Sequence, residues 1–214
     1  MTTPTTYTTL RLILGDQLNH QHSWFDATDD DVLYVLMEVR QETDYVRHHI
    51  QKVVAFFAAM RAFASWLEER GHRVRYMRLD DDDNLHSVTE NIQQLIEAKG
   101  IRRFEYQAPD EYRLDQQLKV FCDSLDIGTA CVSSEHFYTD KYDVRDFFGD
   151  KSYLMERFYR EMRQQHRVLM DDDQPAGGKW NYDQQNRKKL PRGHTPVDIQ
   201  TSDDDVSELV EMIE

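Results

Sequence analysis

The sequence predicts an α/β protein with a Rossmann-like parallel five-stranded sheet and helices on both faces. From the N-terminus to about residue 133, apolar runs of strand length alternate with segments whose apolar residues recur every three or four positions. Glycines follow the helical segments, and a new apolar run begins soon after each glycine. Strands and helices that alternate through short links form a mostly parallel sheet with right-handed crossovers.

The first predicted strand is the run TLRLIL, which stops at Gly15. The other four runs are also of strand length, at seven to nine residues. The five predicted strands are residues 9–14, 31–39, 72–79, 101–107 and 127–133. Binding sites in such sheets lie beyond the carboxyl ends of the strands, near the point where the strand order reverses.

Three amphipathic helices are predicted between these strands. The longest covers residues 44–70 and is closed by Gly71 as its C-cap. The others cover residues 86–99, before Gly100, and residues 111–125. The link between the first two strands is polar and contains the motif SWF, and its pattern is too irregular to predict a helix.

Composition limits the function classes. The 214 residues carry 26 basic and 40 acidic side chains, a formal net charge of −14, so phosphate backbones are repelled and direct DNA binding is not expected. The two cysteines, Cys122 and Cys131, lack zinc or redox spacing, and we expect buried thiols in a reducing compartment. No leader and no apolar segment of membrane-spanning length is apparent, so we expect a cytoplasmic protein without membrane contact.

Polar side chains gather where the first two predicted strands end. Gly15, Asp16 and Gln17 follow the first strand, and Glu38, Arg40 and Glu42 follow the second. The predicted long helix then carries Tyr45, His48 and Lys52 at spacings that place them on one face. Such a crevice suits a planar heterocycle with a polyol side chain, and the sequence has no Gly-rich loop for a pyrophosphate. The alternative interpretation is that each polar residue only ends a strand or caps a helix.

Four runs of aspartate, at 29–31, 80–83, 171–173 and 203–205, lie where loops are predicted. None has the spacing of an EF-hand, so we interpret them as solvated linkers rather than cation sites. The adjacent residues His48 and His49 point about 100° apart on a helix and do not form a metal site.

The chain changes character after the fifth strand. A helix with interleaved basic residues is predicted at 152–168, followed by a long polar loop and an acidic helical segment at 203–214. The sequence therefore predicts an α/β domain at residues 1–150 and a helix with an interdomain linker at residues 151–214.

Four ordered blocks of this sequence are long and specific. They are LILGDQLN, MEVRQETDYVRHHIQKVVAFFAAMRAFA, RVRYMRLDD and SYLMERFYREMRQQHRVLMDDDQPAGGKWNYDQQNRK. In this order they resemble the photolyase-related proteins, the iron–sulfur bacterial branch of the cryptochrome/photolyase family. The resemblance runs from residue 10 to about residue 196.

The resemblance implies that residues 1–150 form the antenna domain of a light-dependent DNA-repair protein. It implies 6,7-dimethyl-8-ribityllumazine as the antenna chromophore, which would pass excitation to FAD in a C-terminal helical half. By their places in the family motifs, the implied binding residues are Asp16, Gln17, Glu42, Tyr45, His48 and Lys52. Asp16 and Glu42 would bond ribityl hydroxyls or ring N–H groups, and Tyr45 would contact the ring.

In longer family members the helical half holds FAD, a 4Fe–4S cluster on four cysteines and the lesion site. Two cysteines cannot supply four thiolates, so we expect the FAD and the cluster only in full-length relatives. The chain alone is then an antenna domain and not a catalyst. Two alternatives stay open: a nucleotide-binding enzyme on the same fold, and an interaction module that docks a separate helical partner through residues 151–192.

Overall fold

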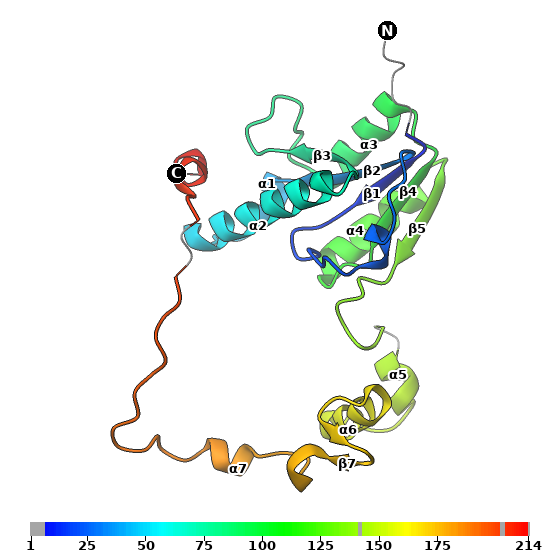
Figure 1. Ribbon diagram of the computed structural model, residues 1–214. Coiled ribbons are helices and arrows are strands. Elements are labelled where there is room, and N and C mark those ends of the chain that lie inside the picture. Colours follow the sequence, from blue (N-terminus) through cyan, green and yellow to red (C-terminus); the bar gives the residue numbers. More distant parts are fainter. Residues whose placement is uncertain (1–6, 141–142, 202–203, 214) are drawn as a thin grey trace. The chain divides into compact units, whose positions relative to one another are not determined.

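The computed structural model describes residues 7–140, 143–201 and 204–213, and these form two compact units (Figure 1). Unit 1 comprises Met1–His136 together with Asp204–Glu214, and unit 2 comprises Phe137–Asp203. The units therefore divide near residue 136 rather than near residue 150, and the last segment of the chain belongs with unit 1.

Unit 1 is built on the predicted five-stranded sheet. Its order is β3-β2-β1-β4-β5, and every neighbouring pair is parallel. The strands are β1 (Thr9–Leu12), β2 (Val32–Met37), β3 (Arg73–Met77), β4 (Arg103–Gln107) and β5 (Gly128–Val132). Each lies inside one of the predicted runs, so the α/β prediction is confirmed.

Helices cover both faces of this sheet, as predicted. The helices of unit 1 are α1 (Arg40–Thr43), α2 (Ile50–Glu69), α3 (Val88–Lys99), α4 (Tyr112–Asp123) and α8 (Ser207–Ile213), with a short 3-10 helix, η1 (Ser23–Phe25). α3 and α4 share one apolar core with the sheet, whereas α2, α8 and η1 share the other. β2 is buried along its whole length, with Val35 in the first core and Leu36 in the second.

The predicted long helix begins later than its apolar pattern indicates. Residues 44–49 lie outside α2, because His49 has an extended backbone and its Nδ1 accepts a hydrogen bond from the amide of Gln51 at 3.2 Å. That contact caps the helix at Ile50. The prediction that Tyr45, His48 and Lys52 share one helical face is therefore wrong, since Tyr45 and His48 precede the helix.

Helix α2 is also the one helix among the described residues that is long and apolar enough, by length and composition, to cross a membrane. The expectation that no apolar segment reaches this length is wrong. Six side chains of α2 are buried in the second core, and a core helix of a soluble protein meets the same criterion. Packing of these six side chains against the sheet accounts for part of the apolar character of α2, since 33% of its most apolar stretch is buried.

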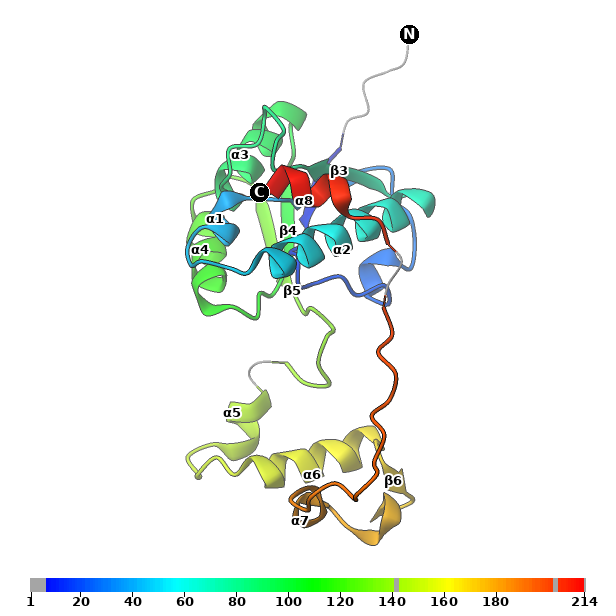
Figure 2. The same cartoon turned by 90° about the vertical axis from the view of Figure 1, so that its left-hand side faces the viewer.

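The C-terminal acidic segment is a helix, as predicted, and it is anchored. Leu209 of α8 is buried in the second core, and Met212 Sδ lies 3.5 Å from Arg61 Nη2 on α2. Figure 2 shows α8 beside α2.

The prediction that both cysteines are buried thiols is half wrong, because Cys122 is partly buried but Cys131 is exposed on the edge strand β5.

Unit 2 contains the predicted helix, a shorter helix before it and further elements inside the predicted polar loop. They are α5 (Asp143–Phe148), α6 (Met155–His166), β6 (Met170–Asp171), β7 (Gln174–Pro175), η2 (Ala176–Gly178) and α7 (Asp183–Asn186). Arg163 organises this unit from α6: its guanidinium is buried and donates to the carbonyls of Val168, Leu169 and Trp180. A buried cation with three carbonyl acceptors holds the turn after α6 against the loop around Trp180.

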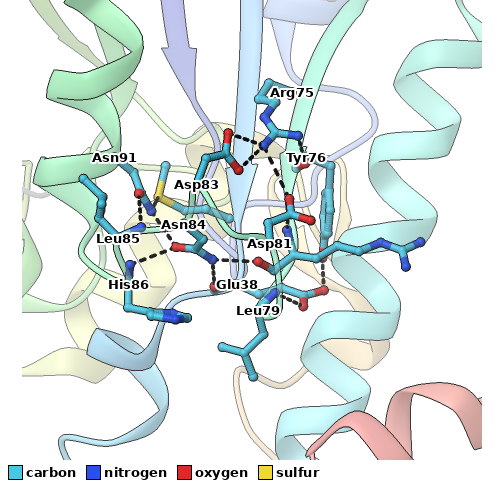
Figure 3. Close-up of polar contacts among 12 residues, drawn as sticks. Glu38, Arg75, Tyr76, Leu79, Asp81, Asp83, Asn84, Leu85, His86 and Asn91 are labelled. Atoms are coloured by element: carbon cyan, nitrogen blue, oxygen red, sulfur yellow. Dashed lines mark hydrogen bonds and ion pairs between the residues drawn. The ribbon is translucent and has the colours of Figure 1, made fainter.

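A buried carboxylate, Glu38, joins β2, β3 and α2 in unit 1 (Figure 3). Arg61 on α2 donates to both carboxylate oxygens, at 2.7 and 3.0 Å. The hydroxyl of Tyr76 donates to the first oxygen at 2.6 Å, and the amide of Leu79 donates to the second at 2.9 Å. All these contacts compensate the cost of removing the charge from water.

The loop after β3 is folded around the same point. Asp80, Asp82 and Asp83 are exposed, as expected of a solvated segment, but the interpretation of residues 80–83 as a linker missed the contacts that order this loop. Asn84 donates from Nδ2 to the carbonyls of Glu38 and Arg78, both at 2.7 Å. Asp83 accepts from Arg75 at 2.8 Å, and Asp81 accepts from the amide of Arg78 at 3.0 Å (Figure 3). These acidic side chains neutralise Arg75 and close the turn.

Removing the arginine partner of Glu38 should destabilise unit 1 strongly. Arg61→Met leaves a fully buried carboxylate without its cation, and we expect a loss on the order of 3 kcal/mol in the free energy of unfolding. Urea unfolding followed by far-ultraviolet circular dichroism measures the loss. Arg73→Met, which breaks the exposed pair with Asp30, is the matched control and should cost less than about 1 kcal/mol. Equal costs for the two variants would refute the role given to Glu38.

Candidate functional site

A cavity of about 240 Å³ opens at the carboxyl ends of β1, β2 and β4. The strand order reverses here, because the chain runs from β1 outward to β2 and β3 and then crosses to β4 on the other side of β1. The inner wall is apolar and is formed by Ile13, Met37, Val39, Phe57, Met60 and Val88. The polar residues at its mouth are Asp16, Glu42, Thr43, Tyr45, His48, Lys52 and Glu111.

Five of the six predicted binding residues line this one cavity: Asp16, Glu42, Tyr45, His48 and Lys52. The sequence thus predicted which side chains converge, although their contact with a ligand stays a prediction. Glu38 and Arg40, also expected in the crevice, lie elsewhere. Glu38 is bound to Arg61, and Arg40 is exposed with its guanidinium 3.8 Å from Asp44.

Gln17, the sixth predicted residue, is buried beside the cavity, with 1% of its surface exposed, and is not among the residues that line it. Its Oε1 accepts from the amide of Leu14 at 3.2 Å. Its Nε2 donates to the carbonyls of Gln107 and Ala108 at 3.2 and 3.3 Å. The amide group therefore ties the end of β1 to the end of β4, which is a structural role.

The protein around Asp16 disfavours the ionised form of its carboxyl group. Although Asp16 is exposed at the mouth, the surrounding protein removes part of its water, and this desolvation raises its pKa. A backbone hydrogen bond opposes this effect and lowers the pKa, and the remaining contributions are smaller: the carboxylates of Asp110 and Glu42 raise the pKa, and His136 lowers it. A carboxyl in this state can donate or accept a hydrogen bond near its pKa.

Glu42, in contrast, is already engaged. Gln41 donates to its Oε1 at 2.9 Å, and Arg113 of α4 donates to its Oε2 at 2.8 Å. The Arg113 guanidinium also lies over the ring of Tyr45, 4.7 Å from its centroid. The sequence analysis did not identify Arg113 as a residue of this site. Arg113 lies in the connection that follows β4, which is the neighbour of β1 on the other side of the point where the strand order reverses.

His48 joins Tyr45 to Lys52 along the mouth. The rings of Tyr45 and His48 meet edge to face with centroids 5.3 Å apart, and Lys52 Nζ lies 3.3 Å from His48 Nδ1. This arrangement comes from the turn before α2 and the first turn of α2. It gives the mouth an aromatic surface with cationic groups at either end.

Gly15 allows α2 to approach the end of β1. A Cβ atom at this position would lie 2.9 Å from Met60 Sδ and 3.3 Å from Phe56 Cδ1. Any larger residue would therefore push into the side chains that form the cavity wall.

The cavity has an apolar wall for one compact ring system and a polar mouth for hydroxyl or amide groups. Its volume of about 240 Å³ lies below the range of pockets that hold drug-sized ligands, roughly 300–1,000 Å³, which suits one heterocycle better than a dinucleotide. Among the described residues, no group of three or more His, Cys, Asp or Glu side chains could hold a metal ion.

Comparison with known proteins gives matches over most of the chain. A model of the family described as deoxyribodipyrimidine photo-lyase-related protein matches residues 11–214. The (6-4) photolyase of Agrobacterium fabrum (strain C58) is 40% identical over 182 residues, which are 84% of this chain and 36% of that protein. The uncharacterized protein R852 of Acanthamoeba polyphaga mimivirus is 25% identical over 175 residues, 78% of this chain and 87% of that protein. The match thus spans little more than a third of the (6-4) photolyase.

Replacing Asp16 by asparagine should stabilise unit 1 at neutral pH. The folded-state pKa of Asp16 is above its ordinary value of 3.8, so its ionisation disfavours the folded state at higher pH. An asparagine side chain does not ionise, and the Asp16→Asn variant should unfold at a higher urea concentration at pH 7. As the pH falls through the folded-state pKa, wild-type Asp16 takes up its proton and the two urea midpoints should converge by about pH 3.5. Identical midpoints at pH 7 would mean that the folded protein does not disfavour the ionised carboxylate.

Proposed function

The chain belongs to the deoxyribodipyrimidine photolyase-related protein family, and we propose that its unit 1 is a light-harvesting domain that binds 6,7-dimethyl-8-ribityllumazine. The bound lumazine would absorb light and pass its excitation to FAD. The observation that supports this proposal best is the cavity at the strand-order reversal, lined by five residues named from the family motifs.

The chemistry of the cavity suits this ligand class. The apolar wall formed by Phe57, Met60 and Ile13 can pack against a flat bicyclic ring. The carboxyl of Asp16 and the side chains of His48 and Lys52 at the mouth can bond ring polar atoms or ribityl hydroxyls. Glu42 retains acceptor capacity beside its bonds to Gln41 and Arg113.

The acceptor of the excitation would be FAD in a helical portion like that of longer family members. We propose that this helical portion, and not unit 1, supplies the FAD, the 4Fe–4S cluster and the DNA contacts. The net charge of −14 disfavours a phosphate backbone, in line with this division of roles.

A nucleotide-binding enzyme has less support. Open backbone amides at a helix N-terminus are the usual phosphate site in this type of fold. Here Glu111 accepts from the amides of Arg113 and Leu114 at the start of α4, at 2.8 and 2.9 Å. His49 occupies the amide of Gln51 at the start of α2 in the same way. These side-chain caps leave fewer free donors for a phosphate.

Unit 2 supports a docking role that is compatible with the antenna role. Within its described residues, the buried apolar aromatic side chains are Phe148 and Phe158, which form a small core for a unit of this length. Many apolar side chains are exposed, among them Tyr138, Tyr153, Leu154, Met155, Tyr159 and Leu169. A surface of this kind is typical of a segment that packs against another domain.

The antenna proposal is tested by titrating the protein with 6,7-dimethyl-8-ribityllumazine and following the lumazine fluorescence. Asp16→Ala and Tyr45→Ala should each weaken binding by roughly 5- to 150-fold, because a lost hydrogen bond to a buried ligand costs on the order of 1 to 3 kcal/mol. Tyr45→Ala also removes ring contact and should be at the upper end of this range.

Asp126→Ala is the matched control, because Asp126 is exposed just before β5, at the opposite end of the sheet from the cavity. The affinity of this variant for the lumazine should stay within about twofold of the wild-type value. Wild-type affinity in both cavity variants, with folding intact by circular dichroism, would show that the cavity is not the lumazine site. Absence of lumazine binding by the wild-type chain would overturn the proposed function itself.

A further inference from the structure

We propose that Arg113 is a positioning residue of the cavity, which holds Glu42 and Tyr45 at its mouth. Arg113 is not among the residues that line the cavity, so it would act through these two neighbours. Its effect on ligand affinity rests on the proposed lumazine site, whereas its effect on the two side-chain positions does not.

The segment that carries Glu42 cannot be held by apolar packing. α1 has four residues and none of its side chains is buried. A helix of one turn has little stability of its own, so its place depends on contacts to the rest of the unit. Those contacts come from distant parts of the sequence, since Arg113 is 71 residues beyond Glu42.

Two side-chain connections attach α1 to its surroundings. Gln41 exchanges hydrogen bonds with Gln117 of α4, at 2.8 and 3.2 Å, and its Oε1 accepts from the amide of Val88 at 3.0 Å. Glu42 receives the Arg113 bond at 2.8 Å. The first connection fixes the position of α1, and the second fixes the direction of the carboxylate beside the cavity.

Arg113 is itself well fixed at the start of α4. Its backbone amide donates to Glu111 at 2.8 Å, and its guanidinium lies 3.5 Å from the same carboxylate. From there the guanidinium bonds Glu42 and covers the face of Tyr45 at 4.7 Å. Because 53% of the Tyr45 surface is exposed, this cation–π contact is a main restraint on the ring.

Without Arg113, the Glu42 carboxylate keeps the bond from Gln41 but loses the one that holds its second oxygen, and the Tyr45 ring loses the partner on its face. The cavity wall of apolar side chains does not include Arg113 and stays in place. Binding should then weaken because the mouth is no longer preorganised, while the fold is retained.

The experiment compares Arg113→Met and Arg113→Lys with the control Arg102→Met, whose side chain is exposed before β4 at the opposite end of the sheet. Lumazine affinity is measured by fluorescence titration, and the Tyr45 ring signals are measured by NMR in the ligand-free protein. We expect Arg113→Met to weaken binding by roughly 5- to 50-fold and to shift the Tyr45 signals. Arg113→Lys keeps a cation, so its loss of lumazine affinity and its shift of the Tyr45 signals should both be smaller than those of Arg113→Met.

A double variant shows whether Arg113 acts through Glu42. Glu42→Gln removes the charged acceptor, so adding Arg113→Met to it should weaken binding by less than Arg113→Met does alone. Independent, additive losses would mean that the two residues do not act as a unit and would overturn the proposal. Wild-type affinity and unshifted Tyr45 signals in a folded Arg113→Met protein would also overturn it.

Failure of the lumazine site and failure of this inference give different results. If wild-type protein does not bind the lumazine, the proposed function is wrong, and the Tyr45 signals of the ligand-free variants decide the positioning role by themselves. A shift in Arg113→Met with none in Arg102→Met supports that role, and equal spectra refute it.

Discussion

The buried carboxylate of Glu38 is the constraint on which much of unit 1 depends. It has no exposed surface, so its charge must be compensated inside the protein by donors from other elements. Those donors come from Arg61 on α2, Tyr76 on β3 and the backbone at Leu79. Satisfying one carboxylate thereby fixes the distance of α2 from the sheet and folds the loop after β3. The first turns of α2 also form a wall of the cavity, so the position of that wall depends in part on a charge that lies outside it.

The cavity itself follows from the strand order. Because β1 is flanked by β2 and β4, the chain segments after these two strands diverge to opposite sides of β1 and leave a space between them. Gln17 keeps the ends of β1 and β4 together behind this space, and Gly15 lets Met60 and Phe56 close one side of it. The polar residues at the mouth then come from three separate connections of the sheet. This origin explains why residues that are distant in sequence share one small volume.

The sequence predicted the sheet and most of the cavity but not the contacts that hold the mouth in place. β2 was predictable because a buried parallel strand is apolar along its whole length. The other four strands, whose apolar residues are interrupted by polar ones, were predictable because they alternate with segments of helical periodicity. Asp16, Glu42 and Tyr45 were predictable because each directly follows a strand or the turn after it. The start of α2 at Ile50 was not predictable, since its capping residue, His49, has no strong sequence signature. Arg113 was missed because its partner Glu42 lies in another connection of the sheet, and periodicity carries no information on such pairs.

The carboxyl groups at the mouth differ in how the surrounding protein affects their ionised forms. Glu111 is used to cap α4, and Glu42 is used to bind Gln41 and Arg113, so both carboxylates stabilise the protein in the absence of any ligand. Asp16 has the opposite energetic character, because the protein around it disfavours its ionised form and raises its pKa. A carboxyl beside a cavity whose ionised form is disfavoured, with a backbone hydrogen bond only partly opposing that effect, is more readily explained by function than by folding. Asp16 at the end of β1 is therefore the mouth residue whose presence most needs a ligand to explain it.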